Sequence, residues 1–201
     1  MSSKGLIFIL SSPSGGGKTS VVKKITTRDT AIRYITSATT RKKRLGEEDG
    51  QDYIYLSPDE FKSWEKDGKF IETTIYHHQR YGTPKRPLLD YIDNGEDVLL
   101  DIDVNGGQRL KEIFPDAVLI FIIPPSREVL AKRLKERGRE RDIEINNRLE
   151  NAEKEIMSAK NYDYLVINDD LENAVSKVMA IITAERCRRE RTIDKVWIKG
   201  G

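Results

Sequence analysis

The sequence predicts an α/β fold in which a parallel sheet is wrapped by helices. Four short apolar runs are separated by longer stretches of helical character. None of the runs alternates apolar and polar residues, which is typical of strands that are buried on both faces. Strands that alternate with helices along a chain form parallel sheets with crossover helices. A glycine-rich segment between the first run and the first helical stretch favours the same class.

The expected elements follow one another in a regular order. The expected strands are Leu6–Leu10, Val98–Ile102, Val118–Ile123 and Tyr164–Ile167, with Tyr34–Ser37 as a weaker candidate for a fifth. The expected helices are Lys18–Asp29, Gly107–Phe114, Arg127–Arg137 and Leu171–Arg189. We interpret the basic stretch Arg186–Arg191 as the solvated end of the last helix.

The segment from about residue 37 to residue 93 does not fit this alternation. Its short β-like pieces are Tyr53–Leu56 and Phe70–Thr73. A helix is expected to begin after Ser57, because Ser57, Pro58 and Glu60 form a capping-box signature. Asp67 and Gly68 would end this helix. We therefore expect a small mixed α/β insert in the parallel core.

The segment Ser11–Thr19 predicts a phosphate-binding loop, because it joins an apolar strand to a helix and is rich in glycine. Glycines let backbone N–H groups turn inward, and with the helix N-terminus these groups bind anions. Lys18 can reach terminal phosphates, and the Thr19 hydroxyl suits Mg²⁺. Ser12 replaces the first glycine of the usual pattern, and a small residue still fits there. A flexible linker is the alternative, but a linker needs neither the Lys-Thr pair nor a buried strand.

Two acids, Asp101 and Asp103, close the second apolar run. Ligands of open parallel sheets bind beyond the carboxyl ends of the strands, so these acids fall at the expected edge. Residues two apart point to the same side while they remain in strand geometry. One acid would serve Mg²⁺ and the other would accept hydrogen bonds from a substrate. Alternatively, both acids cap the following turn, which Asn105–Gly107 favours.

The segment Ala131–Lys160 is dense in charge. A solvated helical hairpin held by pairs four residues apart explains most of these charges. It does not explain the concentration of guanidinium groups in a chain that has a phosphate-binding loop. Some of these arginines are therefore interpreted as facing phosphate.

Composition limits the classes of function. A net charge of +2 over 201 residues gives no electrostatic footprint for nucleic acid, and no apolar run is long enough to span a membrane. Cys187 is the only cysteine, so we expect no internal disulfide and a reducing, cytoplasmic location, with no secretory leader. His77 and His78 are interpreted as solvated rather than metal-binding. The sequence leaves the oligomeric state open.

Several motifs, in the right order, resemble those of guanylate kinases. They are Ser37–Glu47, Gly50, Tyr53, Phe70–Glu72, Tyr81–Thr83, Asp101–Asp103, Pro124–Ser126, Arg133–Leu134, Arg137–Gly138 and Asn168–Asp170. The matches extend from about Gly5 to Arg186, which is nearly the whole chain. The resemblance implies ATP-dependent transfer of a phosphoryl group onto GMP, giving GDP and ADP, with Mg²⁺ as cofactor. It implies a P-loop core (1–36, 94–125 and 161–201), a GMP-binding insert (37–93) and a helical lid with flanking helices (126–160).

The resemblance also implies roles for individual residues. The ATP-binding residues would be Ser14, Gly15, Gly16, Gly17, Lys18, Thr19, Arg137 and Asn168, the last on the adenine side. The GMP-binding residues would be Ser37, Arg41, Arg44, Tyr53, Glu72, Tyr81, Thr83 and Asp103. The catalytic residues would be Lys18, Arg41, Arg137 and Arg148. Thr19 and Asp101 would hold Mg²⁺, Asp101 through water.

The chemistry of this reaction agrees with the residues present. The second pKa of a phosphate monoester is about 6, so the attacking oxygen of GMP is anionic near neutral pH and needs no general base. Catalysis then consists of alignment and charge neutralisation, which suits a chain rich in arginine. Guanine offers N–H donors at N1 and N2 that match Glu72 and Asp103, whereas adenine lacks this donor pair.

Two other interpretations stay open at this point. In the first, the chain is an interaction module that has the same fold but no catalytic activity. Such modules tend to lose parts of the phosphate-binding loop, whereas Lys18, Thr19 and the arginines are all present here. Alternatively, it would be a kinase for another nucleotide or a plain nucleotide hydrolase.

Overall fold

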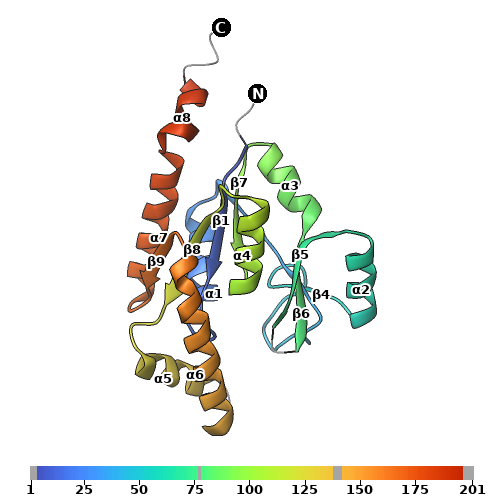
Figure 1. The fold of residues 1–201 in the computed structure, drawn as a ribbon, viewed down its shortest axis with the longest axis vertical. Coiled ribbons are helices and arrows are strands. Elements are labelled where there is room, and N and C mark those ends of the chain that lie inside the picture. Colours follow the sequence, from blue (N-terminus) through green and yellow to red (C-terminus); the bar gives the residue numbers. More distant parts are fainter. Residues whose placement is uncertain (1–3, 77, 138–141, 197–201) are drawn as a thin grey trace.

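The computed structural model describes residues 4–76, 78–137 and 142–196 (Figure 1). Side chains are described for these residues except at positions 137, 142–145, 147 and 193–196. His77, Gly138 and the tail from Trp197 onward therefore lie outside the described residues, and His78 is exposed as expected.

A five-stranded parallel sheet forms the centre of the molecule and confirms the predicted fold class. Its strands, in spatial order, are β2 (Ile32–Ile35), β7 (Asp97–Asp101), β1 (Ile7–Ser11), β8 (Val118–Ile123) and β9 (Tyr164–Ile167). The weaker fifth candidate is thus a strand, two residues earlier than expected. All five residues of β1 are buried, because β1 is the central strand and both of its faces are covered.

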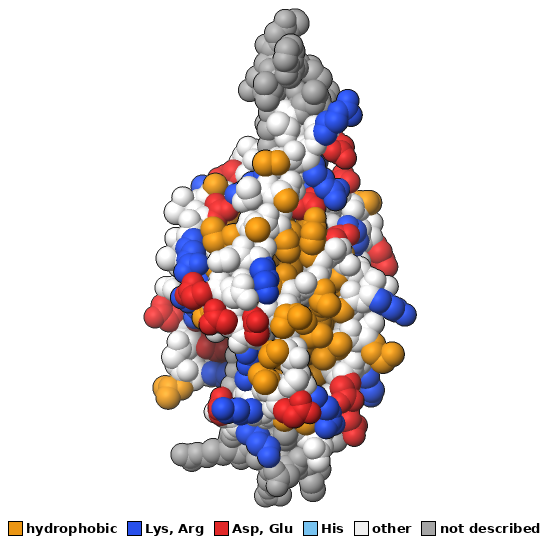
Figure 2. Space-filling model, turned by 90° about the vertical axis from the view of Figure 1, so that its left-hand side faces the viewer, with side chains coloured by type: hydrophobic (Ala, Val, Ile, Leu, Met, Phe, Trp, Pro, Cys, Tyr) orange, Lys and Arg blue, Asp and Glu red, His pale blue; other side chains and the backbone are white. Residues whose placement is uncertain are grey.

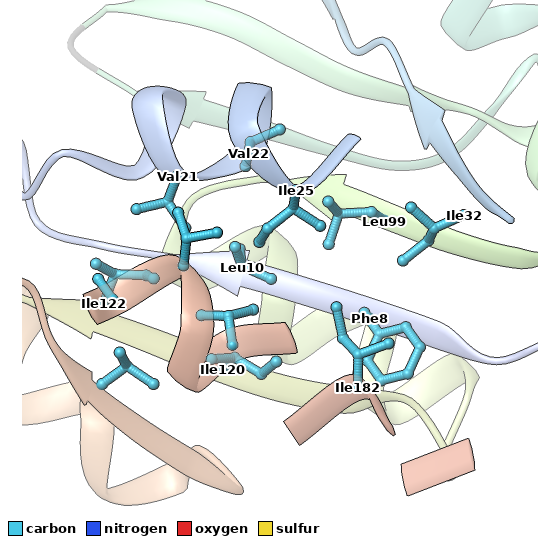
Figure 3. Close-up of a cluster of buried hydrophobic side chains, with 14 of the residues drawn as sticks. Phe8, Leu10, Val21, Val22, Ile25, Ile32, Leu99, Ile120, Ile122 and Ile182 are labelled. Atoms are coloured by element: carbon cyan, nitrogen blue, oxygen red, sulfur yellow. The ribbon is translucent and has the colours of Figure 1, made fainter. Parts of the chain in front are cut away.

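Helices pack on both faces of this sheet. The elements of the core and its flanking helices are α1 (Lys18–Arg28), α3 (Lys85–Asp93), α4 (Val104–Ile113), α5 (Arg127–Arg137), α6 (Asp142–Met157), the 3-10 helix η1 (Ser158–Asn161), α7 (Leu171–Arg186) and α8 (Arg189–Val196). Phe8 and Leu10 of β1 pack with α1 and α7 in the cluster that Figure 3 shows. Ile7 and Ile9 point to the opposite face and pack with α3 and α4. This burial of alternate residues on two apolar faces explains the uniformly apolar run in the sequence.

A second, mixed sheet lies in the segment expected to form the insert. Its strands, in spatial order, are β4 (Ile54–Tyr55), β3 (Ala38–Thr39), β6 (Gln79–Pro84) and β5 (Phe70–Tyr76). Helix α2 (Pro58–Lys66) begins with the predicted capping box, in which Ser57 and Glu60 exchange side-chain and backbone hydrogen bonds. The helix ends at Lys66 with Asp67 as its C-cap, and Gly68 follows with a φ of +66°. Figure 1 shows this sheet and α2 to one side of the parallel sheet.

Two helix boundaries differ from the predicted ones. Helix α4 begins at Val104 rather than Gly107, because the Asp103 side chain accepts hydrogen bonds from the N–H groups of Asn105 and Gly106. The last predicted helix is divided, since α7 ends at Arg186 and α8 begins at Arg189.

The basic stretch Arg186–Arg191 is only partly solvated, because Arg188 and Arg189 are exposed as expected whereas Arg186 and Arg191 are partly buried in ion pairs. The Arg186 guanidinium lies 2.7 Å from the carboxylate of Asp29 and 2.6 Å from that of Asp97. Arg191 pairs at 2.5 Å with Glu185, whose side chain is buried. Arg186 therefore joins the end of α7 to the end of α1 and the start of β7, and Arg191 joins α8 to α7.

Hydrophobic side chains are exposed near the edge of the parallel sheet. Leu165 and Ile167 of the edge strand β9 are exposed, and Figure 2 shows hydrophobic side chains gathered on the face seen from the side of α7 and β9. Among the described helices, none combines the length and apolar character needed to cross a membrane.

Candidate active site

A cavity of about 760 Å³ lies where the carboxyl ends of the core strands face the mixed sheet and α6. Most of the sequence-predicted site residues line it. They are Ser14, Gly15, Gly16, Gly17, Lys18, Thr19, Ser37, Arg41, Arg44, Tyr53, Glu72, Tyr81, Asp101, Asp103 and Arg148. Thr83 and Asn168 lie behind this lining, in contact with residues that form it. Arg137 is the last residue of α5, and its side chain lies outside the described residues.

The loop between β1 and α1 has the backbone geometry of an anion-binding turn. Gly15 and Gly17 have φ angles of +85° and +93°, which side chains rarely allow. The Gly16 N–H donates to the Pro13 carbonyl at 2.8 Å and closes the turn. A Cβ atom at Gly16 would lie 2.9 Å from the Ser12 Cβ, so the small serine at the first loop position faces a residue without a side chain.

Asn168 holds this loop from behind. It follows the end of β9, is only 4% exposed, and donates from Nδ2 to the Gly16 carbonyl at 2.9 Å. A Cβ atom at Gly17 would lie 2.3 Å from the same Nδ2. Arg133 of α5 in turn donates to the Asn168 carbonyl at 2.9 Å. The amide of Asn168 is therefore part of what fixes the loop, whereas its expected place beside adenine stays a prediction.

Lys18 is held by an acid at the end of β7. Its ammonium lies 2.5 Å from Oδ1 of Asp101 and donates to the Ile102 carbonyl at 2.7 Å. Thr19, the expected metal ligand, is exposed on the same cavity. Within the described ranges, no group of three or more His, Cys, Asp or Glu residues could hold a metal ion. A Thr hydroxyl and one carboxylate nevertheless fit Mg²⁺, which commonly takes its other ligands from water and substrate phosphates.

Asp103 does not share the strand geometry of Asp101. Strand β7 ends at Asp101, so the expected alternation does not reach Asp103, which is the N-cap of α4. Of the two acids, Asp103 therefore caps the following turn and Asp101 pairs with Lys18. Asp103 still lines the cavity, because the helix start stands at the carboxyl edge of the sheet.

The insert contributes a guanidinium that is fixed before any ligand binds. Arg41 makes two parallel hydrogen bonds to Glu47, of 2.8 and 3.0 Å, and stands over the Tyr53 ring at 5.2 Å. Burial opposes ionisation of Glu47, but hydrogen bonds from Arg41, Arg44 and Tyr55 outweigh it and lower the pKa of Glu47 to about 2. Glu47 therefore stays charged at neutral pH and orients Arg41 toward the cavity wall.

Two buried oxygens on the cavity wall have no hydrogen-bond partner among the described residues. They are Ser37 Oγ and Glu72 Oε2. The other oxygen of Glu72 accepts a hydrogen bond from the Thr83 hydroxyl at 2.6 Å. Because buried polar atoms are almost always paired, these two oxygens on the cavity wall suit a ligand that donates hydrogen bonds.

The carboxyl of Glu72 is poised between its two protonation states. Burial raises its pKa from 4.5 to about 7, against the opposing effect of the Thr83 hydrogen bond. Because the folded-state pKa is the higher one, ionisation of Glu72 lowers the stability of the free protein as pH rises through about 7. A ligand that donates N–H groups to Glu72 would favour the ionised form.

Helix α6 reaches the phosphate-binding loop with two side chains. Arg148 donates to the Ser14 hydroxyl at 3.0 Å, and Glu155 accepts from the Ser14 N–H at 3.1 Å. Sequence reasoning singled out Arg148 and missed Glu155. The signal was a spacing of seven residues, which places both side chains on one face of a helix.

The parallel sheet, the glycine-rich loop at its carboxyl edge and the facing insert define a P-loop protein with the architecture of a nucleotide kinase. The family model described as Guanylate kinase matches residues 4–185. The chain therefore belongs to the guanylate kinase family. It is a nucleoside monophosphate kinase, as the resemblance of its motifs predicted.

Curated relatives and solved structures agree with this assignment. The guanylate kinase of Caldanaerobacter subterraneus subsp. tengcongensis is 42% identical over 191 residues, covering 95% of this chain and 93% of the relative. That of Oceanobacillus iheyensis is 45% identical over 188 residues, covering 94% and 91%. The crystal structure of guanylate kinase from Anaplasma phagocytophilum is similar with a TM-score of 0.80 and 34% identity, covering 94% of this chain and 90% of that one.

The contact between Asn168 and Gly16 generates a testable prediction. In Asn168→Asp a buried carboxylate would face the Gly16 carbonyl without a proton to donate. We expect the free energy of unfolding in urea to fall by roughly 1–3 kcal/mol. Asn173→Asp makes the same change at an exposed position of α7 and serves as the control. Equal stability of the two variants would show that the amide of Asn168 does not hold the loop.

Proposed function

We propose that this protein transfers the γ-phosphoryl group of ATP to GMP, giving ADP and GDP, with Mg²⁺ as cofactor. One observation carries the proposal. The cavity that begins at a phosphate-binding loop also contains two unpartnered acceptor oxygens, on Ser37 and Glu72, that suit the N–H edge of guanine. A single cavity can therefore hold a triphosphate and a purine monophosphate at the same time.

The donor would occupy the loop. The backbone N–H groups of residues 14–19 would bind the phosphates of ATP, and Lys18 would leave Asp101 to reach the terminal ones. Thr19 would hold Mg²⁺ directly and Asp101 through water, and the ion would neutralise charge on the phosphates. Asn168 would support the adenine side of the site, next to the loop that it already contacts.

The acceptor would bind across the cavity. Its phosphate would meet the cations and hydroxyls of Arg41, Arg44, Tyr53 and Tyr81, all of which line the cavity. Its base would be bound by Ser37, Glu72, Thr83 and Asp103. Glu72 would accept hydrogen bonds from guanine, while adenine would leave its carboxylate buried and unpaired, at a cost in affinity.

The chain would catalyse the transfer by alignment and charge neutralisation. The new bond forms between a phosphate oxygen of GMP and the γ-phosphorus, and the bond to the β–γ bridging oxygen breaks. The attacking oxygen is already anionic near neutral pH, so no side chain has to remove a proton. Lys18, Arg41, Arg137 and Arg148 would offset the repulsion between the two phosphate groups.

The proposal includes a division of the chain into moving parts. Residues 1–36, 94–125 and 161–201 would form the core, 37–93 the GMP-binding insert, and 126–160 the lid. Closure of the lid over both substrates would exclude water, which competes for the phosphoryl group. ATP and GMP would be its partners, and the proposed location is the cytoplasm.

A substrate panel tests the function. We expect steady-state formation of ADP with ATP, Mg²⁺ and GMP, and far slower formation with AMP or UMP as acceptor. A reaction without acceptor measures hydrolysis. Rapid ADP release in that control would indicate a nucleotide hydrolase, and a preference for AMP or UMP would indicate a kinase of another specificity. The comparison of GMP with dGMP defines the sugar preference.

Glu72→Gln tests how the base is chosen. The amide cannot accept from both guanine N–H groups, so we expect the preference for GMP over AMP in kcat/KM to fall by roughly 10-fold or more. In the unaltered protein, ionisation of Glu72 on GMP binding should release protons near pH 7. This release is measured by calorimetry in buffers of different ionisation enthalpy. Glu65→Gln, at an exposed position of α2, is the control. Unchanged selectivity would remove Glu72 from the base site.

Arg148→Ala tests the charge-neutralising role of the lid helix. We expect kcat to fall by roughly 10²–10³-fold, because the guanidinium would act on the transferring phosphoryl group, with the KM for GMP nearly unchanged. Arg127→Ala removes an exposed arginine of α5 and should leave kcat near its original value. A rise in KM alone would argue that Arg148 binds substrate without stabilising the transition state.

A further inference from the structure

A carboxylate of the chain itself occupies part of the phosphate-binding loop. Oε2 of Glu155 accepts the Ser14 N–H at 3.1 Å, although this N–H belongs to the loop that would bind ATP. Glu155 is half-buried on the cavity wall, within the electrostatic influence of Lys18. Amide donors of such a loop serve anions, and here the anion is supplied by α6.

The Glu155 carboxylate joins three parts of the protein. It belongs to α6, it accepts from Ser14 in the loop, and the Tyr76 hydroxyl of β5 in the insert donates to it. Arg148, two turns earlier on the same helix face, donates to the Ser14 hydroxyl. Leu149 and Ala152 of α6 pack against α5 between these two polar contacts. The helix is thus fixed on the loop through side chains on its inner face.

We propose that Glu155 is an internal anion that occupies the Ser14 N–H of the phosphate-binding loop until the triphosphate of ATP displaces it. Glu155 thereby lowers the affinity for ATP. This inference rests on the proposed binding of ATP at the loop. It assigns to Glu155 a positioning role, since the carboxylate acts through α6 and the loop rather than on the reacting atoms.

Electrostatics explain why the carboxylate must leave. The Ser14 N–H cannot donate fully to two acceptors, and a phosphate placed beside an ionised carboxylate would be repelled. Burial and the nearby Asp103 already raise the pKa of Glu155, against hydrogen bonds from Ser14 and Tyr76. A bound triphosphate would add several negative charges to this environment. Once Glu155 has moved away, its contacts with the loop and with Tyr76 are lost together.

The matched substitution Glu155→Gln removes the charge and keeps the size of the side chain. We expect the Kd for ATP with Mg²⁺ and without GMP, measured by calorimetry, to fall by roughly tenfold, because a charge-assisted hydrogen bond no longer competes. The same gain should appear with inorganic tripolyphosphate. Glu150→Gln, on the same helix at an exposed position, makes the same change in net charge and should leave the Kd unaltered.

A second variant keeps the inference falsifiable if Glu155→Gln does not fold. Tyr76→Phe removes the hydrogen bonds of this hydroxyl with Glu155 and with the Ser14 side chain and keeps the charge of Glu155, so the Kd for ATP should fall by about threefold. An unchanged or higher Kd in the folded variants would overturn the role of Glu155, as would a gain seen with ATP but not with tripolyphosphate. Absence of ATP binding in the unaltered protein would instead overturn the proposed function.

Discussion

Several cations stand close together around one cavity, and the free protein tolerates them because its own carboxylates neutralise them. Asp101 pairs with Lys18, and Glu47 holds Arg41 through two hydrogen bonds. Like charges in a confined space of low polarity would otherwise repel strongly. The positions of Lys18 beside the loop and of Arg41 in the insert depend on these two pairs. In the proposed reaction, the phosphates of ATP replace Asp101 as the partner of Lys18, while Glu47 keeps Arg41 in place.

The core of the fold could be predicted because burial on both faces leaves a clear pattern in the sequence. The central strand β1 contains apolar residues on both faces, and its neighbours repeat the pattern. The capping box at Ser57 is likewise a local signal, set by residues three apart. The start of α4 was predicted three residues too late. The pair Gly106–Gly107 is typical of a turn, but Asp103 caps a helix that includes both glycines. A cap depends on backbone geometry that composition alone does not show.

The candidate site was predicted where residue type alone indicates chemistry, as for the glycines of the loop and Lys18. Motif resemblance supplied the residues whose type is ambiguous, Ser37 and Glu72 among them. Sequence reasoning missed side chains whose importance comes from tertiary contact. Glu155 is one acid among many on a charged helix, and only the fold brings it to Ser14. Asn168 was predicted from the resemblance for the adenine side, but its hydrogen bond to the Gly16 carbonyl, 152 positions away, comes only from the fold.

The ion pairs of Arg186 lie at the amino-terminal ends of the core strands, whereas the cavity lies at their carboxyl ends. Arg186 connects the end of α7 to Asp29, after α1, and to Asp97, where β7 begins. None of these three residues lines the cavity. The ion pairs that connect α7, α1 and β7 thus lie apart from the residues that line the cavity. Substitutions that add contacts around Arg186 would therefore raise the thermal stability of the protein without changing the residues of the cavity. This region is the one to choose for engineering a more thermostable enzyme.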